Sequence, residues 1–110
     1  MVLEAVYQES LEHELSLRGI PYLTQHPIKL TYKGHALRQS YIPDFICYEK
    51  LILEIKAHKH LLDEHRAQLI NYLKATSYTL GILINFGSPE RLKFERLANS
   101  PEYSCYSRYS

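Results

Sequence analysis

Apolar residues recur at helical spacing in two parts of the chain. In residues 2–18, Tyr7 and Leu15 share one face with Glu4, and a glycine and a proline follow the segment. This pattern predicts a helix that ends just before the glycine. Residues 61–75 return to the same period and predict a second helix.

The other apolar segments have extended patterns. Strands are predicted at residues 28–32, 36–48, 51–57 and 79–86. A further helix is predicted over residues 89–98. The order α-β-β-β-α-β is typical of an α/β domain with a mixed four-stranded sheet flanked by helices. Residues 100–110 are rich in Tyr and Ser, so we expect a flexible C-terminal tail after a single domain at residues 1–99.

Composition excludes several classes of protein. No apolar run approaches the roughly 20 residues that a membrane-spanning helix needs, and the first residues lack the basic segment of a secretory signal. The two cysteines, Cys47 and Cys105, are expected to be free thiols in a reducing cytoplasm. Thirteen Lys and Arg against twelve Asp and Glu give a net charge of +1, which does not by itself indicate a nucleic-acid-binding protein.

Charged residues interrupt the apolar pattern in residues 41–57, YIPDFICYEKLILEIKA. Strand alternation places Glu54 and Lys56 on one face, and pairing of the two strands would bring Asp44 close to them. Because unpaired charges are costly in a core, two interpretations stand. One is an ion pair of Lys56 with either carboxylate at a sheet edge. The other is a site for a divalent metal ion such as Mg²⁺, bound by Asp44, Glu54 and the carbonyl oxygen of Ile55.

These residues match a known signature. Pro43-Asp44, nine intervening residues and then Glu54-Ile55-Lys56 resemble the PD-(D/E)xK motif, and the predicted element order resembles the core of that nuclease superfamily. Gln68 and Tyr72 are similar to the QxxxY motif of its RecB-like members.

The first helix carries a further resemblance. Residues 3–7, LEAVY, are similar to the end of the GxxExxY motif that names a small bacterial family in the superfamily, and the resemblance extends over about residues 2–98. Met1 stands where that motif has glycine. The departure bears on the packing of the first helix and therefore on the placement of Glu4.

The resemblance implies a restriction-endonuclease-like fold and hydrolysis of DNA phosphodiester bonds with Mg²⁺ or Mn²⁺. It implies that Asp44 and Glu54 bind the metal with help from Glu4, and that Lys56 serves the attacking water. Residues on one face of the second helix would support the site or contact DNA. They are His65, Gln68 and Tyr72.

Other functions are weighed against this one. A zinc site at His58, His60, His65 and Cys47 lacks the usual ligand spacing. The same fold could also serve as an inactive binding or regulatory module, or as a nuclease for RNA or nucleotides. A domain of this size has little room for a recognition subdomain, so we expect a homodimer or a partner protein to help hold DNA. No organic cofactor and no membrane partner are expected.

Charge is unevenly distributed along the chain. Acidic residues concentrate on the first predicted helix. Basic residues surround the first predicted hairpin and the end of the strand that carries Lys56. In the hairpin they are Lys29, Lys33, His35 and Arg38. A basic rim around an acidic metal centre would suit a phosphodiester substrate.

Overall fold

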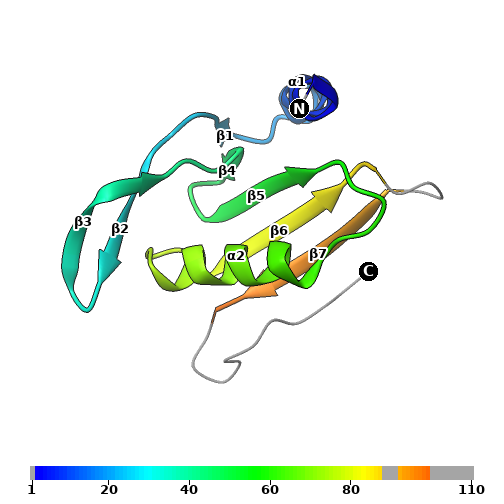
Figure 1. Cartoon of the computed structure of the whole chain (residues 1–110). Helices are drawn as coiled ribbons and strands as arrows, with labels where there is room; N and C mark the ends of the chain where they lie inside the picture. Colours follow the sequence, from blue (N-terminus) through cyan, green and yellow to red (C-terminus); the bar gives the residue numbers. More distant parts are fainter. Residues whose placement is uncertain (1, 88–91, 100–110) are drawn as a thin grey trace.

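The computed structural model describes residues 2–87 and 92–99. In chain order the elements are α1 (Val2–Leu17), β1 (Tyr22–Leu23), β2 (Ile28–Tyr32), β3 (His35–Tyr41), β4 (Phe45–Cys47), β5 (Leu51–Lys56), α2 (Asp63–Lys74), β6 (Leu80–Asn85) and β7 (Lys93–Ala98) (Figure 1). Both long helices therefore lie where the apolar spacing predicts them. The predicted strand at residues 36–48 is divided into two strands with different partners.

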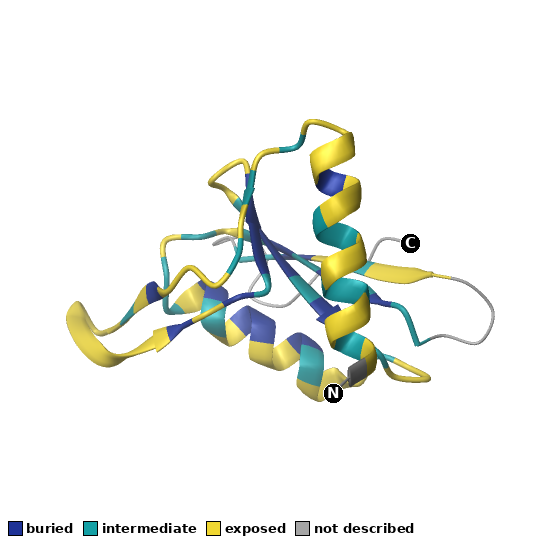
Figure 2. Ribbon diagram, turned by 90° about the horizontal axis from the view of Figure 1, so that it is seen from above, coloured by how far each residue is buried: buried dark blue, intermediate teal, exposed yellow. Residues whose placement is uncertain are grey.

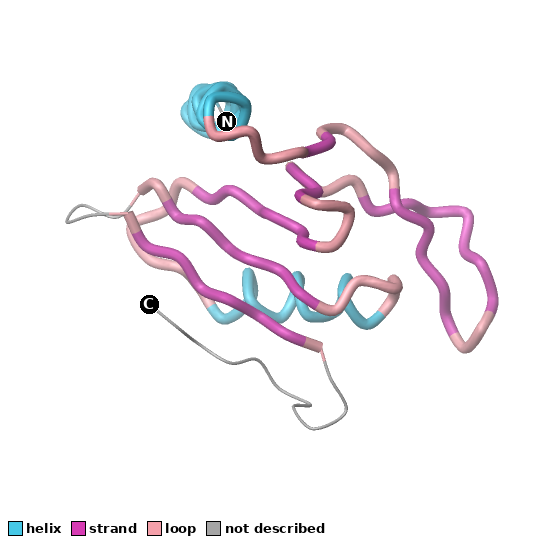
Figure 3. The backbone as a smooth tube through the Cα atoms, turned by 180° about the vertical axis from the view of Figure 1, so that it is seen from behind, coloured by secondary structure: helices cyan, strands magenta, loops and turns pink. Residues whose placement is uncertain are grey.

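Five strands form one mixed sheet in the order β1-β4-β5-β6-β7. Only β5 and β6 are parallel, and α2 makes the crossover that parallel neighbours require. The helices lie on opposite faces of this sheet (Figures 1 and 3). The predicted fold class is thus confirmed, but the sheet has five strands rather than four. Strands β2 and β3 form a separate two-stranded sheet.

Strand alternation divides the core between the two helices. On one face of the sheet, Ile46 and Ile52 pack with Leu69 and Leu73 of α2. Phe45, Cys47, Leu53 and Ile55 point to the other face, where they pack with Leu15 of α1. Figure 2 shows the buried positions of these strands in dark blue and the partly buried ones in teal. The same alternation leaves Glu54 and Lys56 of β5 for chemistry, since they lie on either side of the buried Ile55 and point to the other face.

The predicted helix at residues 89–98 is wrong over the part that the structure describes. Strand β7 pairs antiparallel with β6 from Leu80↔Ala98 to Asn85↔Lys93. Its residues have good helix propensity, but β6 needs hydrogen-bond partners along that edge, and this requirement overrides a weak local preference. Leu97 becomes fully buried in the core beneath α2.

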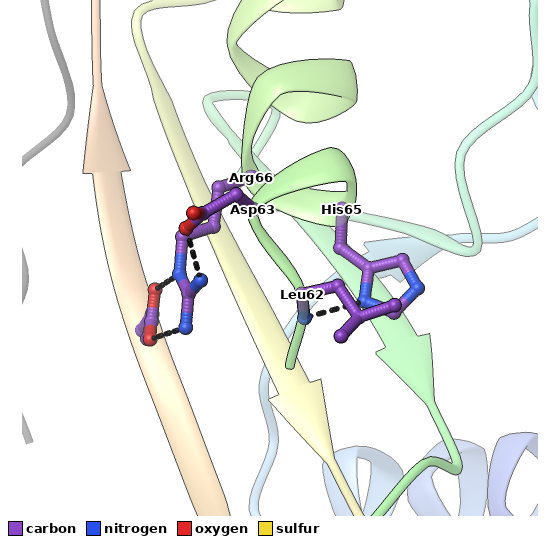
Figure 4. A network of polar contacts seen from close by, with 5 residues as sticks. Leu62, Asp63, His65 and Arg66 are labelled. Atoms are coloured by element: carbon purple, nitrogen blue, oxygen red, sulfur yellow. Dashed lines mark hydrogen bonds and ion pairs between the residues drawn. The ribbon is translucent and has the colours of Figure 1, made fainter. Parts of the chain in front are cut away.

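An ion-pair network fastens β7 to α2 (Figure 4). The guanidinium of Arg66 donates two hydrogen bonds to the carboxylate of Glu95, at 2.5 and 2.7 Å, and one to Asp63 at 2.8 Å. Arg66 and Glu95 expose only 11% and 14% of their side chains. A bidentate pair with this burial holds the helix against the edge strand.

The expectations about a membrane span, the cysteines and the C-terminal tail have different outcomes. Neither described helix is long and apolar enough to cross a membrane. Cys47 is a free and buried thiol, as expected, and burial raises the pKa of that thiol. Cys105 and the predicted tail at residues 100–110 lie outside the described residues.

Candidate metal and phosphodiester site

The β4–β5 hairpin brings the two predicted carboxylates together. Its register pairs Phe45 with Leu53, so Asp44 lies opposite Glu54. The backbone N–H of Asp44 donates to Oε1 of Glu54 at 2.8 Å, and the N–H of Ile55 donates to Oδ2 of Asp44 at 2.7 Å. One oxygen of each carboxylate is thus held by the main chain of the opposite strand, which orients the second oxygen for another ligand.

Helix α1 supplies a second wall to this site. A pocket of about 550 Å³ is lined by Asp44 and Ile55 of the hairpin region and by Glu4, Gln8 and other residues of α1. Gln8 anchors the wall, because its side-chain amide donates to the carbonyl oxygen of Asp44 at 3.3 Å. The structure therefore brings Glu4 to the side of the pocket that Asp44 lines, despite the missing glycine before it. Sequence reasoning missed Gln8, although it lies one helical turn after Glu4 on the same face.

Ionisation of both carboxylates at once is unfavourable. Burial and then the charge of Asp44 raise the pKa of Glu54 to about 7. Burial also raises the pKa of Asp44, while the N–H of Ile55 and the charge of Lys56 oppose that rise. Desolvation and mutual repulsion of this kind favour protonation of one acid, or a cation between them.

Lys56 lies at the carboxyl end of β5, which runs between β4 and β6 inside the sheet. It forms no salt bridge with any residue in the described part of the chain, although its charge lowers the pKa of both carboxylates. The interpretation as an ion pair at a sheet edge is therefore wrong on both counts. The ammonium group remains near the carboxylates without being neutralised by either.

A polar clamp fixes the chain directly after Lys56. The side chain of Asn85 accepts a hydrogen bond from the N–H of His58 at 3.0 Å and donates one to its carbonyl oxygen at 2.8 Å. The N–H of Phe86 donates to the carbonyl oxygen of Lys56 at 2.9 Å. A Cβ at Gly87 would lie 2.4 Å from the backbone nitrogen of His58, so only glycine allows this approach. Sequence reasoning missed Asn85, whose signal is a polar residue ending an apolar strand.

An aromatic stack closes the face of the site toward α2. The rings of Tyr41 and Tyr72 are parallel within 4°, with centroids 3.8 Å apart. The Tyr41 hydroxyl is buried beside the Glu54 carboxylate, without hydrogen-bond geometry to any described residue. Burial and the adjacent charge of Glu54 raise the pKa of Tyr41. Tyr72 therefore reaches the site through Tyr41, a residue that sequence reasoning did not single out.

The remaining predicted residues of α2, His65 and Gln68, lie nearer the N-terminus of the helix than Tyr72 does. Nδ1 of His65 accepts a hydrogen bond from the N–H of Leu62 at 3.1 Å (Figure 4), and its ring contacts that of His58 with centroids 4.6 Å apart. Burial, followed by the charges of His58 and Lys56, lowers the pKa of His65. Gln68 is exposed and makes no hydrogen bond to Lys56 or to a carboxylate in the described part of the chain. The structure thus brings His65 close to Lys56 and leaves Gln68 in a groove beside Tyr72.

The donor set fits a hard divalent cation. Within residues 2–87 and 92–99, no three His, Cys, Asp or Glu side chains gather tightly enough to hold a metal ion by themselves. Mg²⁺ needs no such cage, since it usually takes one or two carboxylates and keeps several waters. Asp44 and Glu54 offer two oriented carboxylates with raised pKa values, and the region around Ile55 offers a main-chain oxygen.

The chain belongs to the PD-(D/E)XK nuclease superfamily, whose sequence profile matches residues 1–97. No curated protein matches the chain. Among solved structures, it is similar to the crystal structure of SSO0001, with a TM-score of 0.70 and 22% sequence identity. The match covers 94% of this chain and 54% of that one, so the chain spans about half the length of that relative. At this identity the likeness supports the fold alone.

Proposed function

We propose that this chain is a Mg²⁺- or Mn²⁺-dependent nuclease that hydrolyses phosphodiester bonds in DNA, and that within its superfamily it is related to the GxxExxY family. The observation that carries the proposal is the pair of carboxylates, Asp44 and Glu54, each hydrogen-bonded to the main chain of the other strand. Lys56 lies beside them and forms no salt bridge with a described residue. Membership of a nuclease superfamily supports the same chemistry.

Each residue has a role that its position supports. Asp44, Glu54 and the carbonyl oxygen of Ile55 would hold the metal, with Glu4 acting from α1 through water. A bound Mg²⁺ lowers the pKa of water and neutralises charge that develops on a phosphate. Lys56 would orient the attacking water or hold a phosphate oxygen, since no ion pair with a described residue occupies its donors.

Cleavage assays test this proposal directly. Linear, circular and single-stranded DNA are incubated with the chain in EDTA, Mg²⁺ and Mn²⁺. We expect cleavage only with metal, and we expect Lys56→Ala to reduce it at least a hundredfold while circular dichroism shows an unchanged fold. Lys50→Ala, a change of an exposed cation in the turn before β5 and so at the opposite end of that strand, is the control and should retain activity. Undiminished cleavage by Lys56→Ala would remove Lys56 from the mechanism.

Calorimetry separates this function from that of an inactive module with the same fold. We expect the wild-type chain to bind Mg²⁺ or Mn²⁺, and we expect the Asp44→Asn variant to bind neither. An absence of metal binding together with an absence of cleavage would refute the nuclease. Cleavage of RNA but not of DNA would keep the chemistry and change the substrate.

A further inference from the structure

The β2–β3 hairpin, residues Ile28–Tyr41, projects from the body of the molecule (Figures 1 and 2). Residues 31–40 are all exposed, and only the ends of the hairpin, at Ile28 and Tyr41, are buried. Its turn at Lys33-Gly34 has a positive φ at both residues, as tight two-residue hairpin turns require. Two-stranded hairpins are marginally stable alone, and this one adds little to the core. Its presence in the fold therefore suggests a role other than stability.

The hairpin lies in a region without acidic residues. No Asp or Glu occurs between Leu15 and Pro43, although four Lys or Arg residues do. Three of these, Lys29, Lys33 and Arg38, are exposed on the hairpin and form no salt bridge within the described part of the chain. Unpaired cations on a projecting ribbon complement a polyanion.

The two faces of the hairpin differ. Leu30 and Leu37 face α2 and line a groove of about 720 Å³ with Gln68 and Tyr72. The pairing register shifts between Lys29 and Thr31, so this part of the ribbon is irregular. Lys29 and Arg38 are the chain neighbours of these two leucines, and neither cation lines the groove, so we place both on the opposite face. The hairpin thus presents a basic outer face and a half-apolar inner one.

The hairpin is also fixed relative to the candidate site. Tyr41, its last residue, stacks on Tyr72 and precedes Asp44 by three positions. The N–H of Thr31 donates to the carbonyl oxygen of Ala75 at 3.0 Å, which fastens β2 to the end of α2. A polyanion on the hairpin is therefore held at a set distance from the carboxylates.

We propose, on the basis of the nuclease function above, that the β2–β3 hairpin is an arm that grips duplex DNA. A strand of seven residues such as β3 is about 20 Å long, and a two-stranded ribbon has the width that the major groove of B-DNA admits. The opposite wall of the site repels phosphate, because Glu4, Glu9 and Glu12 of α1 line it. Duplex DNA is therefore held by the basic outer face of the hairpin rather than by the acidic face of α1.

The test compares two double variants with equal changes of charge. Lys29→Gln with Arg38→Gln removes the cations of the outer face. Lys50→Gln with Lys93→Gln removes two exposed cations outside the hairpin. Binding of a labelled duplex of about 25 base pairs, and of one of its strands, is measured by fluorescence anisotropy in EDTA at several salt concentrations. Because EDTA prevents metal-dependent cleavage, the result is independent of the active site.

We expect the wild-type chain to bind the duplex more tightly than the single strand. The hairpin variant should bind duplex about tenfold more weakly at about 0.1 M salt, and the slope of log K against log salt should fall by about two. The control variant should stay within about threefold of wild type. Circular dichroism should show that both variants fold.

Three outcomes would overturn the proposal. They are equal losses in the two variants, wild-type binding of single strands at least as tight as that of duplex, and no duplex binding by the wild-type chain. Loss of a dimer in the hairpin variant, seen by sedimentation without any change in DNA affinity, would show that the hairpin binds a second copy of the chain instead. If Mg²⁺-dependent cleavage is retained in any of these cases, the nuclease function still stands. If the hairpin variant loses duplex affinity as expected but the wild-type chain cleaves no DNA, only the nuclease function is refuted.

Discussion

Replacing Glu54 with glutamine should stabilise the metal-free protein. The substitution keeps the shape of the side chain and an oxygen that can accept the hydrogen bond from Asp44, but it removes the charge. A pKa of about 7 in the folded chain against 4.5 in a model peptide corresponds to about 3 kcal/mol. That figure is an upper bound for the gain, since water entry and relaxation lower the cost of a buried charge.

The sign and the pH range follow from the same pKa values. Below pH 4.5, Glu54 is protonated in both the folded and the unfolded chain, so Glu54→Gln and the wild type should have nearly equal free energies of unfolding. As the pH rises from 4.5 to about 7, the unfolded chain releases its proton more readily than the folded chain does. The wild type therefore loses stability relative to the variant over that interval, and the difference is constant above it.

Urea unfolding in EDTA at several pH values, followed by circular dichroism because the chain has no Trp, measures this difference. Glu49→Gln, at an exposed position in the turn after β4, is the control and should show a difference near zero throughout. Addition of Mg²⁺ at pH 8 should stabilise the wild type and not Glu54→Gln. A difference that does not grow with pH, or that favours the wild type at pH 8, would refute the account of Glu54 as a buried charge held for a cation.

Three further predictions address other parts of the structure. Calorimetric titration of Mg²⁺ at pH 6.5 in buffers of different ionisation enthalpy should show proton release, because Glu54 must ionise to bind metal; a heat independent of the buffer would contradict this. Arg66→Met should lower the free energy of unfolding by about 3–5 kcal/mol, because Glu95 is left buried without its partner, and Glu95→Leu in the same chain should restore much of the loss. Tyr41→Phe should leave the stability in EDTA within about 1 kcal/mol of wild type or raise it, since the hydroxyl that it removes is buried beside the Glu54 carboxylate without hydrogen-bond geometry to any described residue; a loss above about 2 kcal/mol would show that the hydroxyl donates to Glu54.

The sequence could predict what depends on local periodicity. Apolar spacing located α1 and α2, and the alternation in β4 and β5 separated Glu54 and Lys56 from their buried neighbours, because a strand of period two leaves little choice of face. The pairing of Asp44 with Glu54 was also accessible, since only a short turn separates their strands.

Features that depend on distant partners could not be predicted in this way. Strand β7 has the composition of a helix and becomes a strand because β6 offers an open edge. Asn85 clamps a loop 27 residues earlier in the chain, and nothing in its neighbours marks that contact. Tyr41 joins the site through a stack on Tyr72, which requires the positions of both the hairpin and α2.

The separate sheet formed by β2 and β3 has a consequence for how such a chain can diverge. The residues proposed for metal and water chemistry on the sheet lie between Asp44 and Lys56, and none of the pairings of the five-stranded sheet passes through residues 28–41. Insertions, deletions or exchange of charge at the hairpin tip therefore leave the reacting groups in register. Changes at the hairpin can therefore alter what the chain binds while the arrangement of Asp44, Glu54 and Lys56 stays the same.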